Sequence, residues 1–302
     1  MNELKRRRIN VRKPRAGGFL GVPFEKYAAC HALNNSKLKK ILTSPAHFKF
    51  QYPDTSTLSF GRLYHELTLT PRQFDRNWAV YEGKTRRGKE WENFRLTAGD
   101  KDICTAKEKD DAQAIADAVR RTPIGKEYIR GKGHNEVTLI WEEEIEGERL
   151  KLKCRLDRVA LSDQGETHAL VDLKGTTADT KDAFAREAAR YHYEMQAAFY
   201  MRGWEAVTGQ TLANHEFVFV AVEKATRIVS AYWLPADALH AGRQKVNTAL
   251  RRYVECKRTN HWPPPNHGRA EELTTYFPKD FEGVIDLGAM TGETVGLEDI
   301  AA

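Results

Sequence analysis

The first half of the chain repeats apolar residues with a helical period. The segment STLSFGRLYHELTLTP predicts an amphipathic helix, whose apolar face holds Phe60, Leu63, Tyr64 and Leu67. A second helix is expected in NNSKLKKILTSPAHF, which starts with cap-type residues and is halted by Pro45. A third is expected in AKEKDDAQAIADAVRRTP, which is acidic at its start and basic at its end.

After residue 135 the pattern changes to the two-residue period of strands. The segments EVTLIWEEE, ERLKLKCRLDRVAL and HALVDLK predict three strands, separated by the turn-like IEGE and SDQGE. Two helices follow (DTKDAFAREAARY and HYEMQAAFYMRGWEAVTG), then two strands (HEFVFVAVEK and RIVSAYWL) and a helix from about Asp237 to Thr259. The order β-β-β-α-α-β-β, with helices before it, predicts a mixed α/β domain.

These elements predict a single domain over residues 31–265, with a helical part over 31–130 and a core of sheet and helices over 131–265. Residues 1–30 contain the basic run KRRRINVRKPR and are expected to form a flexible arm, either solvated or touching DNA. Residues 266–302 are expected to form a C-terminal tail, because their periodicity is weak. The polar stretch EGKTRRGKEW is expected to be a surface loop.

Composition narrows the class of protein. The formal net charge of +6 permits an anionic partner without requiring one. No window approaches the roughly 18 apolar residues of a membrane span. The four cysteines are far apart, which argues against a zinc ribbon and a disulfide scaffold and fits a reducing cytosol. We therefore expect a cytoplasmic protein with no membrane partner.

One group of charges at the ends of two expected strands suggests chemistry. Asp157 lies in the second strand, and Asp172 and Lys174 end the third. If these strands form a hairpin, the acids converge, and the i, i+2 spacing points Asp172 and Lys174 into one cleft. Paired carboxylates suit Mg²⁺ or Mn²⁺, and the lysine would hold or help deprotonate an attacking water. The plain alternative is a set of solvated charges.

Four more side chains are candidates for the same site. Gln196 and Tyr200 share one helix face at i, i+4, where an amide and a phenol can reach a phosphate or orient the lysine. His65 would complete an Asp–Asp–His metal set, and Glu136 at the entry to the first strand is a further carboxylate. The alternatives are half-buried packing for the pair, a satisfied histidine at the rim of an apolar face, and an exposed glutamate.

Together these segments resemble the RecE-like (exonuclease VIII) branch of the PD-(D/E)XK nuclease superfamily, which is common in phages and prophages. The resemblance spans roughly Asn34 to Trp204 and rests on SPAHF, FGRLYHELTLTP, GHNEVTLIW, KCRLDRV, LVDLKGTTAD and YHYEMQAAFYMRGW, which follow the family's order. Leu156 replaces the proline of the family's motif, and Gly175 departs from the expected KTT. The implied fold is a restriction-endonuclease-like core, with a mixed central sheet flanked by helices.

The resemblance also implies roles for individual residues. Asp157, Asp172, His65 and the Leu173 carbonyl would bind the metal, with Glu136 as an outer carboxylate. Lys174 would be the catalytic lysine, and Gln196 and Tyr200 the QxxxY pair of the bridging helix. The implied cofactor is Mg²⁺, with Mn²⁺ as a substitute. The implied activity is 5′→3′ digestion of linear double-stranded DNA, leaving a 3′ single strand for an annealing protein of the RecT type, by a ring-shaped homo-oligomer.

Three other functions compete with this interpretation. A nuclease with an iron–sulfur cluster needs a close group of cysteines near the C-terminus, where only Cys256 lies, so no cluster is expected. A structure-specific or restriction-type endonuclease would use the same acids and lysine. An inactive DNA-binding module would tend to lose those charges, because unpaired charges in a cleft are costly, and all of them are present.

DNA contacts are expected mainly in the polar loop before residue 92. Its cations would bind phosphates without reading sequence, and its tryptophan would stack on an end base or wedge the strands apart. The alternative is an ordinary solvated surface. The candidates are Lys84, Arg86, Arg87, Lys89 and Trp91.

Overall fold

The structure of the chain, a computed structural model, describes residues 4–5, 9–49, 56–83 and 85–269. The chain divides into two compact units, residues 1–263 and residues 264–302. The first unit holds the sheet and the helices. Of the second unit, residues 264–269 are described, and they contain a short 3₁₀ helix, η4 (Pro265–Gly268). No helix in the described part of the chain is long and apolar enough to cross a membrane.

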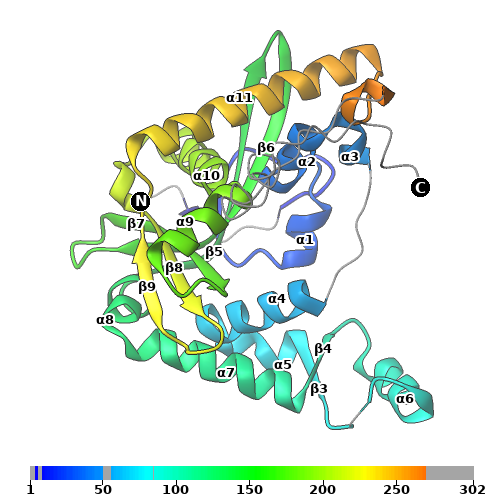
Figure 1. The fold of residues 1–302 in the computed structure, drawn as a ribbon, viewed down its shortest axis with the longest axis vertical. Coiled ribbons are helices and arrows are strands. Elements are labelled where there is room, and N and C mark those ends of the chain that lie inside the picture. Colours follow the sequence, from blue (N-terminus) through cyan, green and yellow to red (C-terminus); the bar gives the residue numbers. More distant parts are fainter. Residues whose placement is uncertain (1–3, 6–8, 50–55, 84, 270–302) are drawn as a thin grey trace, which may run out of the picture. The chain divides into compact units, whose positions relative to one another are not determined.

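Seven strands within the described residues form one mixed sheet in the order β1-β2-β5-β6-β7-β8-β9 (Figure 1). Neighbouring strands are antiparallel except β1 with β2 and β7 with β8, which are parallel. Two short parallel strands, β3 and β4, pair separately. The strands are β1 (Leu4–Lys5), β2 (Gly17–Phe19), β3 (Trp78–Tyr81), β4 (Asp102–Thr105), β5 (Gly133–Ile145), β6 (Glu148–Leu161), β7 (Thr167–Thr176), β8 (Phe217–Glu223) and β9 (Val229–Tyr232).

Helices cover both faces of the sheet, and the side chains of β8 alternate between them. Phe217 and Phe219 join the core formed with α2, α9, α10 and α11, whereas Val218 and Val220 join the core formed with α4 and α7 (Figure 1). The helices are α1 (Phe24–Ala29), α2 (Asn35–Thr43), α3 (Pro45–Lys49), α4 (Ser56–Leu69), α5 (Phe74–Asn77), α6 (Gly88–Ala98), α7 (Ala106–Arg121), α8 (Pro123–Gly125), α9 (Lys181–Arg190), α10 (Tyr193–Thr208) and α11 (Ala236–Thr259), with the helical turns η1 (Pro71–Gln73), η2 (Lys126–Arg130) and η3 (Asn214–Glu216).

The long hairpin of β5 and β6 forms the middle of the sheet, where the sequence predicts two strands and a turn. Ile145 pairs with Glu148, so Glu146 and Gly147 form a two-residue turn. Both turn residues have positive φ, 51° and 81°. Such a turn matches the right-handed twist of the flanking strands, and the glycine reaches this conformation without the steric cost that a side chain adds.

The N-terminal segment differs from the flexible arm expected over residues 1–30. Strand β2 pairs with β5, and Phe19, Tyr27 and Cys30 are buried against Ile140. Their apolar side chains explain the difference, because they cover the edge of the sheet that β5 would otherwise expose. Residues 1–3 and 6–8 of the expected arm, and residues 270–302 of the expected tail, lie outside the described residues.

The polar loop expected around residues 82–91 is helical in its second half, since α6 begins at Gly88. The helices expected around residues 34–48, 56–71 and 106–123 are present as α2 with α3, α4 and α7. The start of α7 is fixed by a capping box between Thr105 and Glu108. The five strands and three helices expected after residue 135 also form in the predicted order.

Candidate active site

Three carboxylates lie in one row across β5, β6 and β7. Paired residues flank them: the pairs of Asn135 and Val137 with β6 enclose Glu136 and Asp157, and the β6–β7 pairing stops one residue before Asp157 and Asp172. Side chains in such cross-strand positions are neighbours on one face of a sheet, so three like charges meet there. The pairs that set these registers are Asn135 with Arg158 and Arg158 with Val171.

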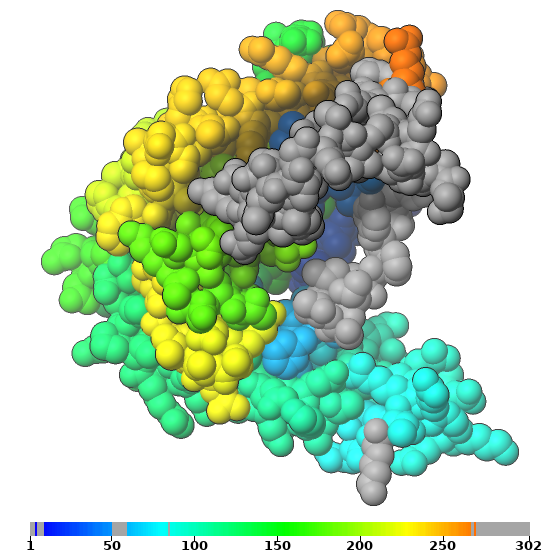
Figure 2. Space-filling view, viewed as in Figure 1, coloured from blue at the N-terminus to red at the C-terminus, as the bar shows by residue number. Residues whose placement is uncertain are grey.

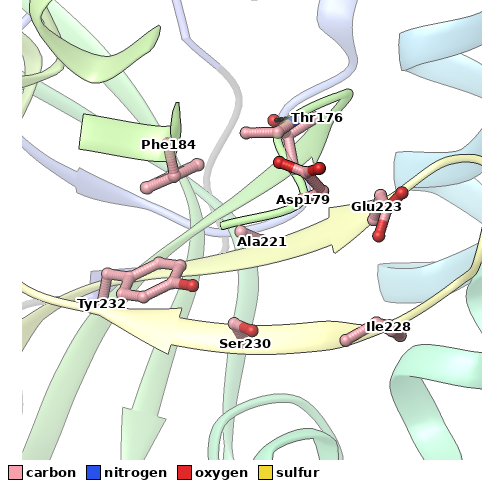
Figure 3. A pocket seen from close by; sticks show the side chains of 9 residues that line it. Thr176, Asp179, Phe184, Ala221, Glu223, Ile228, Ser230 and Tyr232 are labelled. Atoms are coloured by element: carbon pink, nitrogen blue, oxygen red, sulfur yellow. Dashed lines mark hydrogen bonds between the residues drawn. The ribbon is translucent and has the colours of Figure 1, made fainter. Parts of the chain in front are cut away.

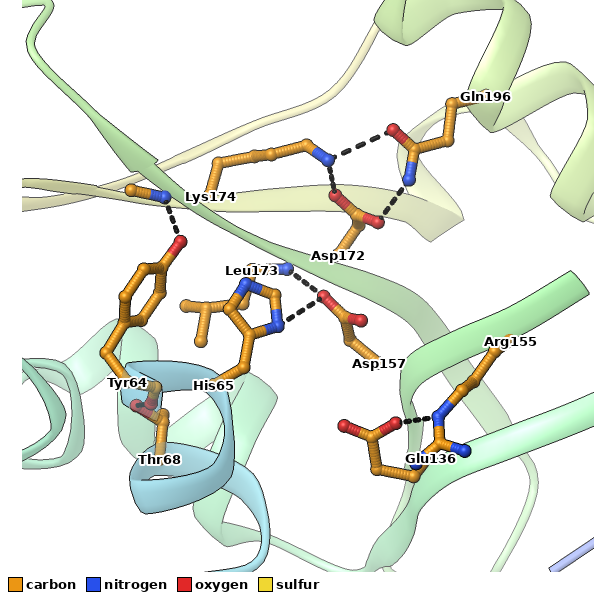
Figure 4. Close-up of polar contacts among 11 residues, drawn as sticks. Tyr64, His65, Thr68, Glu136, Arg155, Asp157, Asp172, Leu173, Lys174 and Gln196 are labelled. Carbon is orange, nitrogen blue, oxygen red and sulfur yellow. Dashed lines mark hydrogen bonds and ion pairs between the residues drawn. The ribbon is translucent and has the colours of Figure 1, made fainter. Parts of the chain in front are cut away.

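Asp172 is held by a lysine and a glutamine. Lys174 Nζ lies 2.5 Å from Asp172 Oδ2 and donates to Gln196 Oε1 at 3.0 Å. Gln196 Nε2 in turn donates to Asp172 Oδ1 at 2.7 Å (Figure 4). Gln196 comes from α10, which packs on the face of the sheet to which β7 points these side chains. The amide thus fixes the carboxylate and the ammonium group relative to each other.

Asp157 is held by contacts from β7 and α4. Its Oδ2 accepts a hydrogen bond of 2.8 Å from the Leu173 backbone N–H and lies 3.4 Å from His65 Nδ1 (Figure 4). A hydrogen bond with the Leu173 backbone raises the pKa of His65. Only an acceptor raises the pKa of an imidazole, so this group is the Leu173 carbonyl. The structure therefore brings His65, Asp157 and the Leu173 carbonyl together.

The charges of the row perturb the pKa values of its members. Burial raises the pKa of Asp157 well above its usual value, and the charges of Asp172 and Glu136 raise it further. Burial lowers the pKa of His65, as does Lys174, against the opposing effect of Glu136 and Asp172. Negative charge is therefore in excess at Asp157, where a cation would be stabilised.

Glu136 stands at an irregular point of β5. It has a φ of 55° and interrupts the ladder of hydrogen bonds between β5 and β6. Its carboxylate pairs with Arg155 (Figure 4). A left-handed conformation in a residue with a side chain costs energy, and such strain often marks a functional position. Glu136 nevertheless remains within electrostatic reach of Asp157 and His65.

Tyr200 lies one helical turn after Gln196 on α10. Its ring packs against Phe217 with the centroids 6.2 Å apart. Burial raises its pKa well above the usual value, and Asp172 and Asp157 act in the same direction. No hydrogen bond links Tyr200 to either acid in the described part of the chain. It borders the site without touching the lysine.

Tyr64 belongs to the site, although the sequence indicated it only as an apolar helix position. Its hydroxyl accepts a hydrogen bond of 2.7 Å from the Gly175 N–H (Figure 4). A Cβ at position 175 would come within 2.8 Å of that hydroxyl. The glycine that departs from the family's KTT therefore permits the close approach of α4 to β7, and β7 continues in register through Thr176.

The acidic row offers oxygen and nitrogen donors for a metal ion. In the described ranges, no group of three His, Cys, Asp or Glu side chains is arranged as a ready-made metal site. The carboxylates are instead occupied by Lys174, Gln196, His65 and a backbone N–H. However, Asp172 Oδ2 is buried and accepts no hydrogen bond, although it forms an ion pair with Lys174. The site offers two carboxylates, an imidazole and a carbonyl, and negative charge is in excess there. Such a set of ligands suits a divalent cation.

A pocket opens beside β7, just beyond Lys174 (Figure 3). It is lined by Thr176, Phe184 and Tyr232 and by two carboxylates, Asp179 and Glu223. The hydroxyl of Thr176 donates to Glu187 on α9 at 2.6 Å. Acidic walls repel phosphate, so this pocket is not suited to the DNA backbone.

The expected DNA contacts of the loop lie apart from the acidic row. Arg86 pairs with Glu108 at 2.5 Å and lies 5.9 Å above the ring of Trp91, which packs edge-on against Tyr81. Arg87 and Lys89 are exposed, and Lys84 lies outside the described residues. Figure 1 shows α6, which carries Lys89 and Trp91, well away from α10. The structure therefore does not bring these residues to the site.

One solved structure is similar to this chain in fold. A crystal structure from Eubacterium rectale, named "Putative exonuclease", matches with a TM-score of 0.52 and 15% identity over 83% of this chain and 92% of that chain. The structure of SSO0001 matches with a TM-score of 0.30 and 14% identity over 74% of this chain and 88% of that chain. No curated protein matches the chain significantly.

The family comparison covers most of the chain. Residues 29–274 match the family described as "PDDEXK-like domain of unknown function (DUF3799)". The α/β core with a mixed central sheet flanked by helices, predicted from the sequence, is thereby confirmed. The protein belongs to this PDDEXK-like family, within the PD-(D/E)XK nuclease superfamily.

Proposed function

We propose that the protein is a metal-dependent deoxyribonuclease that hydrolyses phosphodiesters of linear double-stranded DNA from its ends. The observation that carries this proposal is the arrangement of Asp157, Asp172, Lys174 and Gln196, in which a lysine and an amide hold an acid beside a second acid. These are the residues to which the resemblance to PD-(D/E)XK nucleases assigns the chemistry. Inactivity is disfavoured, because every charged group of the site is present and in contact.

Lys174 positions the attacking water. An ammonium group has three donors; Gln196 accepts one of them and Asp172 forms an ion pair with the group, which leaves a donor for a water or a phosphoryl oxygen. Gln196 keeps this geometry rigid, because it contacts both partners. Pre-organised donors of this kind stabilise charge that develops in the transition state without reorganisation.

A divalent ion, Mg²⁺ or Mn²⁺, would be held by Asp157, Asp172, His65 and the Leu173 carbonyl, with Glu136 as an outer carboxylate. When bound, it supplies a Lewis acid for the phosphate and lowers the pKa of water. His65 suits this role because burial keeps its pKa low, so the imidazole stays neutral and can act as a ligand.

Three finer features of the proposal rest on the resemblance of the motifs to RecE-like nucleases. They are 5′→3′ polarity, a ring-shaped homo-oligomer around DNA, and a 3′ single strand handed to an annealing protein of the RecT type, in a phage or prophage setting. The likeness to a protein named as an exonuclease supports the preference for ends over internal sites. An endonuclease on the same core is the alternative outcome.

The test is digestion of a linear duplex labelled at either 5′ end or internally, beside a closed circular duplex, with Mg²⁺ and then Mn²⁺. We expect loss of the linear DNA, an intact circle, and release of the 5′ label first. Lys174→Met should lower turnover at least about 100-fold, whereas Lys107→Met, at an exposed lysine of α7, should not change it. Cutting of the circle would show an endonuclease, and no cutting with either metal would refute the nuclease proposal.

A further inference from the structure

Two tyrosines connect the candidate active site with the surface. Tyr191 lies in the turn between α9 and α10 and is 49% exposed. Its ring stacks on that of Tyr193 with the centroids 6.1 Å apart and the planes at 24°. Tyr193 is buried, and Lys174 Nζ lies 4.6 Å from its ring centroid. We call Tyr191 and Tyr193 the tyrosine ladder, because their rings lead outward from the proposed catalytic lysine.

The ladder is held in a fixed conformation. His192, between the two tyrosines, has a φ of 54°, which turns the chain sharply. Its Nδ1 lies 3.1 Å from Lys245 Nζ, and Lys245 pairs with Glu194 at 2.6 Å. The hydroxyl of Tyr193 donates to Glu187 at 3.2 Å. An exposed aromatic ring on such a rigid turn pays little entropy when it binds a ligand.

Two cations flank the ladder. Lys39 of α2 donates to the Tyr191 carbonyl at 2.5 Å, and its Nζ lies 6.0 Å from the Tyr193 ring centroid. The guanidinium of Arg190 lies 5.5 Å from the Tyr191 ring centroid. Neither Lys39 nor Arg190 forms an ion pair with a carboxylate in the described part of the chain, whereas Lys245 next to them does. Burial lowers the pKa of Lys39 to about 8, and its charge also faces Asp172 and Glu194, so Arg190 is the more available of the two cations to an anion.

We propose that the tyrosine ladder, with Lys39 and Arg190, binds a single strand of DNA next to the scissile phosphate. This inference rests on the proposed nuclease function and adds a subsite to it. A base stacks on the exposed ring of Tyr191, and the backbone phosphates contact the two cations. Aromatic faces interleaved with unmatched cations are how proteins bind single strands without reading sequence. The ladder continues from Lys174, so the bound strand is the one that the lysine serves.

The location of the ladder fits a strand that reaches the acids. Glu187 of α9 contacts both Tyr193 and Thr176, which lies two residues after Lys174. Figure 2 shows α9 (bright green) at the surface, with α4 (light blue) exposed beneath it on the same face. Glu187 is also within electrostatic reach of Tyr64 on α4. The turn after α9 therefore stands near the surface from which α4 and β7 present the site.

The test is binding of a fluorescent single-stranded oligonucleotide in EDTA, where no cleavage interferes. Tyr191→Ala should weaken binding about 5- to 150-fold, because one base loses its stacking partner. Tyr191→Phe should retain binding, since the ring is kept. Trp233→Ala, at another exposed aromatic side chain (59% exposed), is the matched control and should bind like wild type. Arg190→Ala and Lys39→Met should each reduce the salt slope of binding by about 0.7.

The outcomes separate this inference from the nuclease proposal. Unchanged binding in Tyr191→Ala, or an equal loss in Trp233→Ala, would overturn the ladder even if the wild type digests DNA. Weak binding in Tyr191→Ala with rescue by Tyr191→Phe would support the ladder even if no metal-dependent cleavage were seen. Thermal unfolding of each variant excludes a folding defect, which we do not expect at an exposed ring.

Discussion

Asp157 is placed where function and stability conflict. Its carboxylate faces two other acids, and its raised pKa means that the folded protein resists the ionised form. Asp157→Asn keeps an oxygen that can accept from the Leu173 N–H but removes the charge. We therefore expect this variant to be more stable than wild type in EDTA by about 1 kcal/mol or more, a rise in melting temperature of roughly 2 °C or more.

The same substitution should abolish metal-dependent digestion, because it removes a proposed ligand. Thermal unfolding with and without Mg²⁺ checks both effects: the metal should raise the melting temperature of wild type and leave Asp157→Asn unchanged. A variant less stable than wild type in EDTA would show that the acidic row is not under electrostatic strain.

Gln196 acts through both ends of its amide, and two substitutions separate them. Gln196→Glu keeps an acceptor for Lys174 but sets a carboxylate against Asp172, where Nε2 donated at 2.7 Å. Gln196→Met removes both contacts and leaves buried groups unsatisfied, at about 1–3 kcal/mol. We expect both variants to lose most activity, with the apparent affinity for Mg²⁺ higher in Gln196→Glu than in Gln196→Met because of the added charge. Metal titrations of DNA digestion measure this, and equal affinities would contradict it.

At the residue scale, the sequence indicated those site residues that lie in recognisable motifs or at the ends of predicted strands. Asp157, Asp172 and Lys174 follow from strand patterning, and His65, Gln196 and Glu136 from the motifs around them. The structure brings these six together. Tyr64, Tyr193 and Lys39 were not identified, because an aromatic at a helical apolar position and a lysine on an amphipathic helix look like packing and solvated charge. Only the tertiary approach of α4 and α2 to β7 and α10 reveals them.

At the scale of elements, long periodic segments were predictable and short ones were not. The hairpin of β5 and β6 has alternation over its length and a turn with glycine, so it could be predicted. Strand β2 is three residues long with two glycines, and β3 and β4 have four residues each. Such strands form because tertiary partners supply their hydrogen bonds. Helix α6 buries no residue fully, and its polar sequence resembles a loop.

The N-terminal segment depends on one buried lysine of β6. Lys153 Nζ donates to the carbonyls of Tyr27, Ala28 and Cys30 at 2.5, 3.1 and 2.8 Å, where α1 ends. The Tyr27 and Cys30 carbonyls also accept backbone N–H groups, from Cys30 and Ala32, so Lys153 is the donor that all three carbonyls share. We expect Lys153→Met to lower the free energy of unfolding by roughly 3 kcal/mol, because buried acceptors lose their donor. Chemical denaturation at pH 7 measures this, with Arg149→Met, at a 77% exposed side chain of β6, as the control.

The stability of this segment should also depend on pH. Burial lowers the pKa of Lys153 to about 8, from 10.5. Because the folded pKa is lower, the unfolded chain binds more protons between these values, so stability rises with pH through that window. Below pH 8 the cost of burying the charge is fully present. The difference in unfolding free energy between wild type and Lys153→Met should therefore grow from pH 8 to pH 10. A constant difference would contradict the lowered pKa.

At the scale of the whole molecule, the family match and the first compact unit end at different residues. The match extends to residue 274, whereas the first unit ends at Pro263. The sequence predicted the boundary at residue 265, next to the proline run, because the periodicity after it is weak. Trp262 stacks on Phe48, with the centroids 5.2 Å apart, and packs on Tyr253 of α11.

Two truncations test where the folded unit ends. A chain ending at Pro263 keeps Trp262 and the hydrogen bond of 3.1 Å from the Ala46 N–H to the Pro263 carbonyl. We expect its melting temperature and its digestion of linear DNA to match those of the full chain. A chain ending at Asn260 loses the ring between α3 and α11 and should be less stable by on the order of 2 kcal/mol. Thermal unfolding of both measures this difference. Equal losses would show that residues after 263 contribute to the fold, because only the shorter chain lacks the tryptophan.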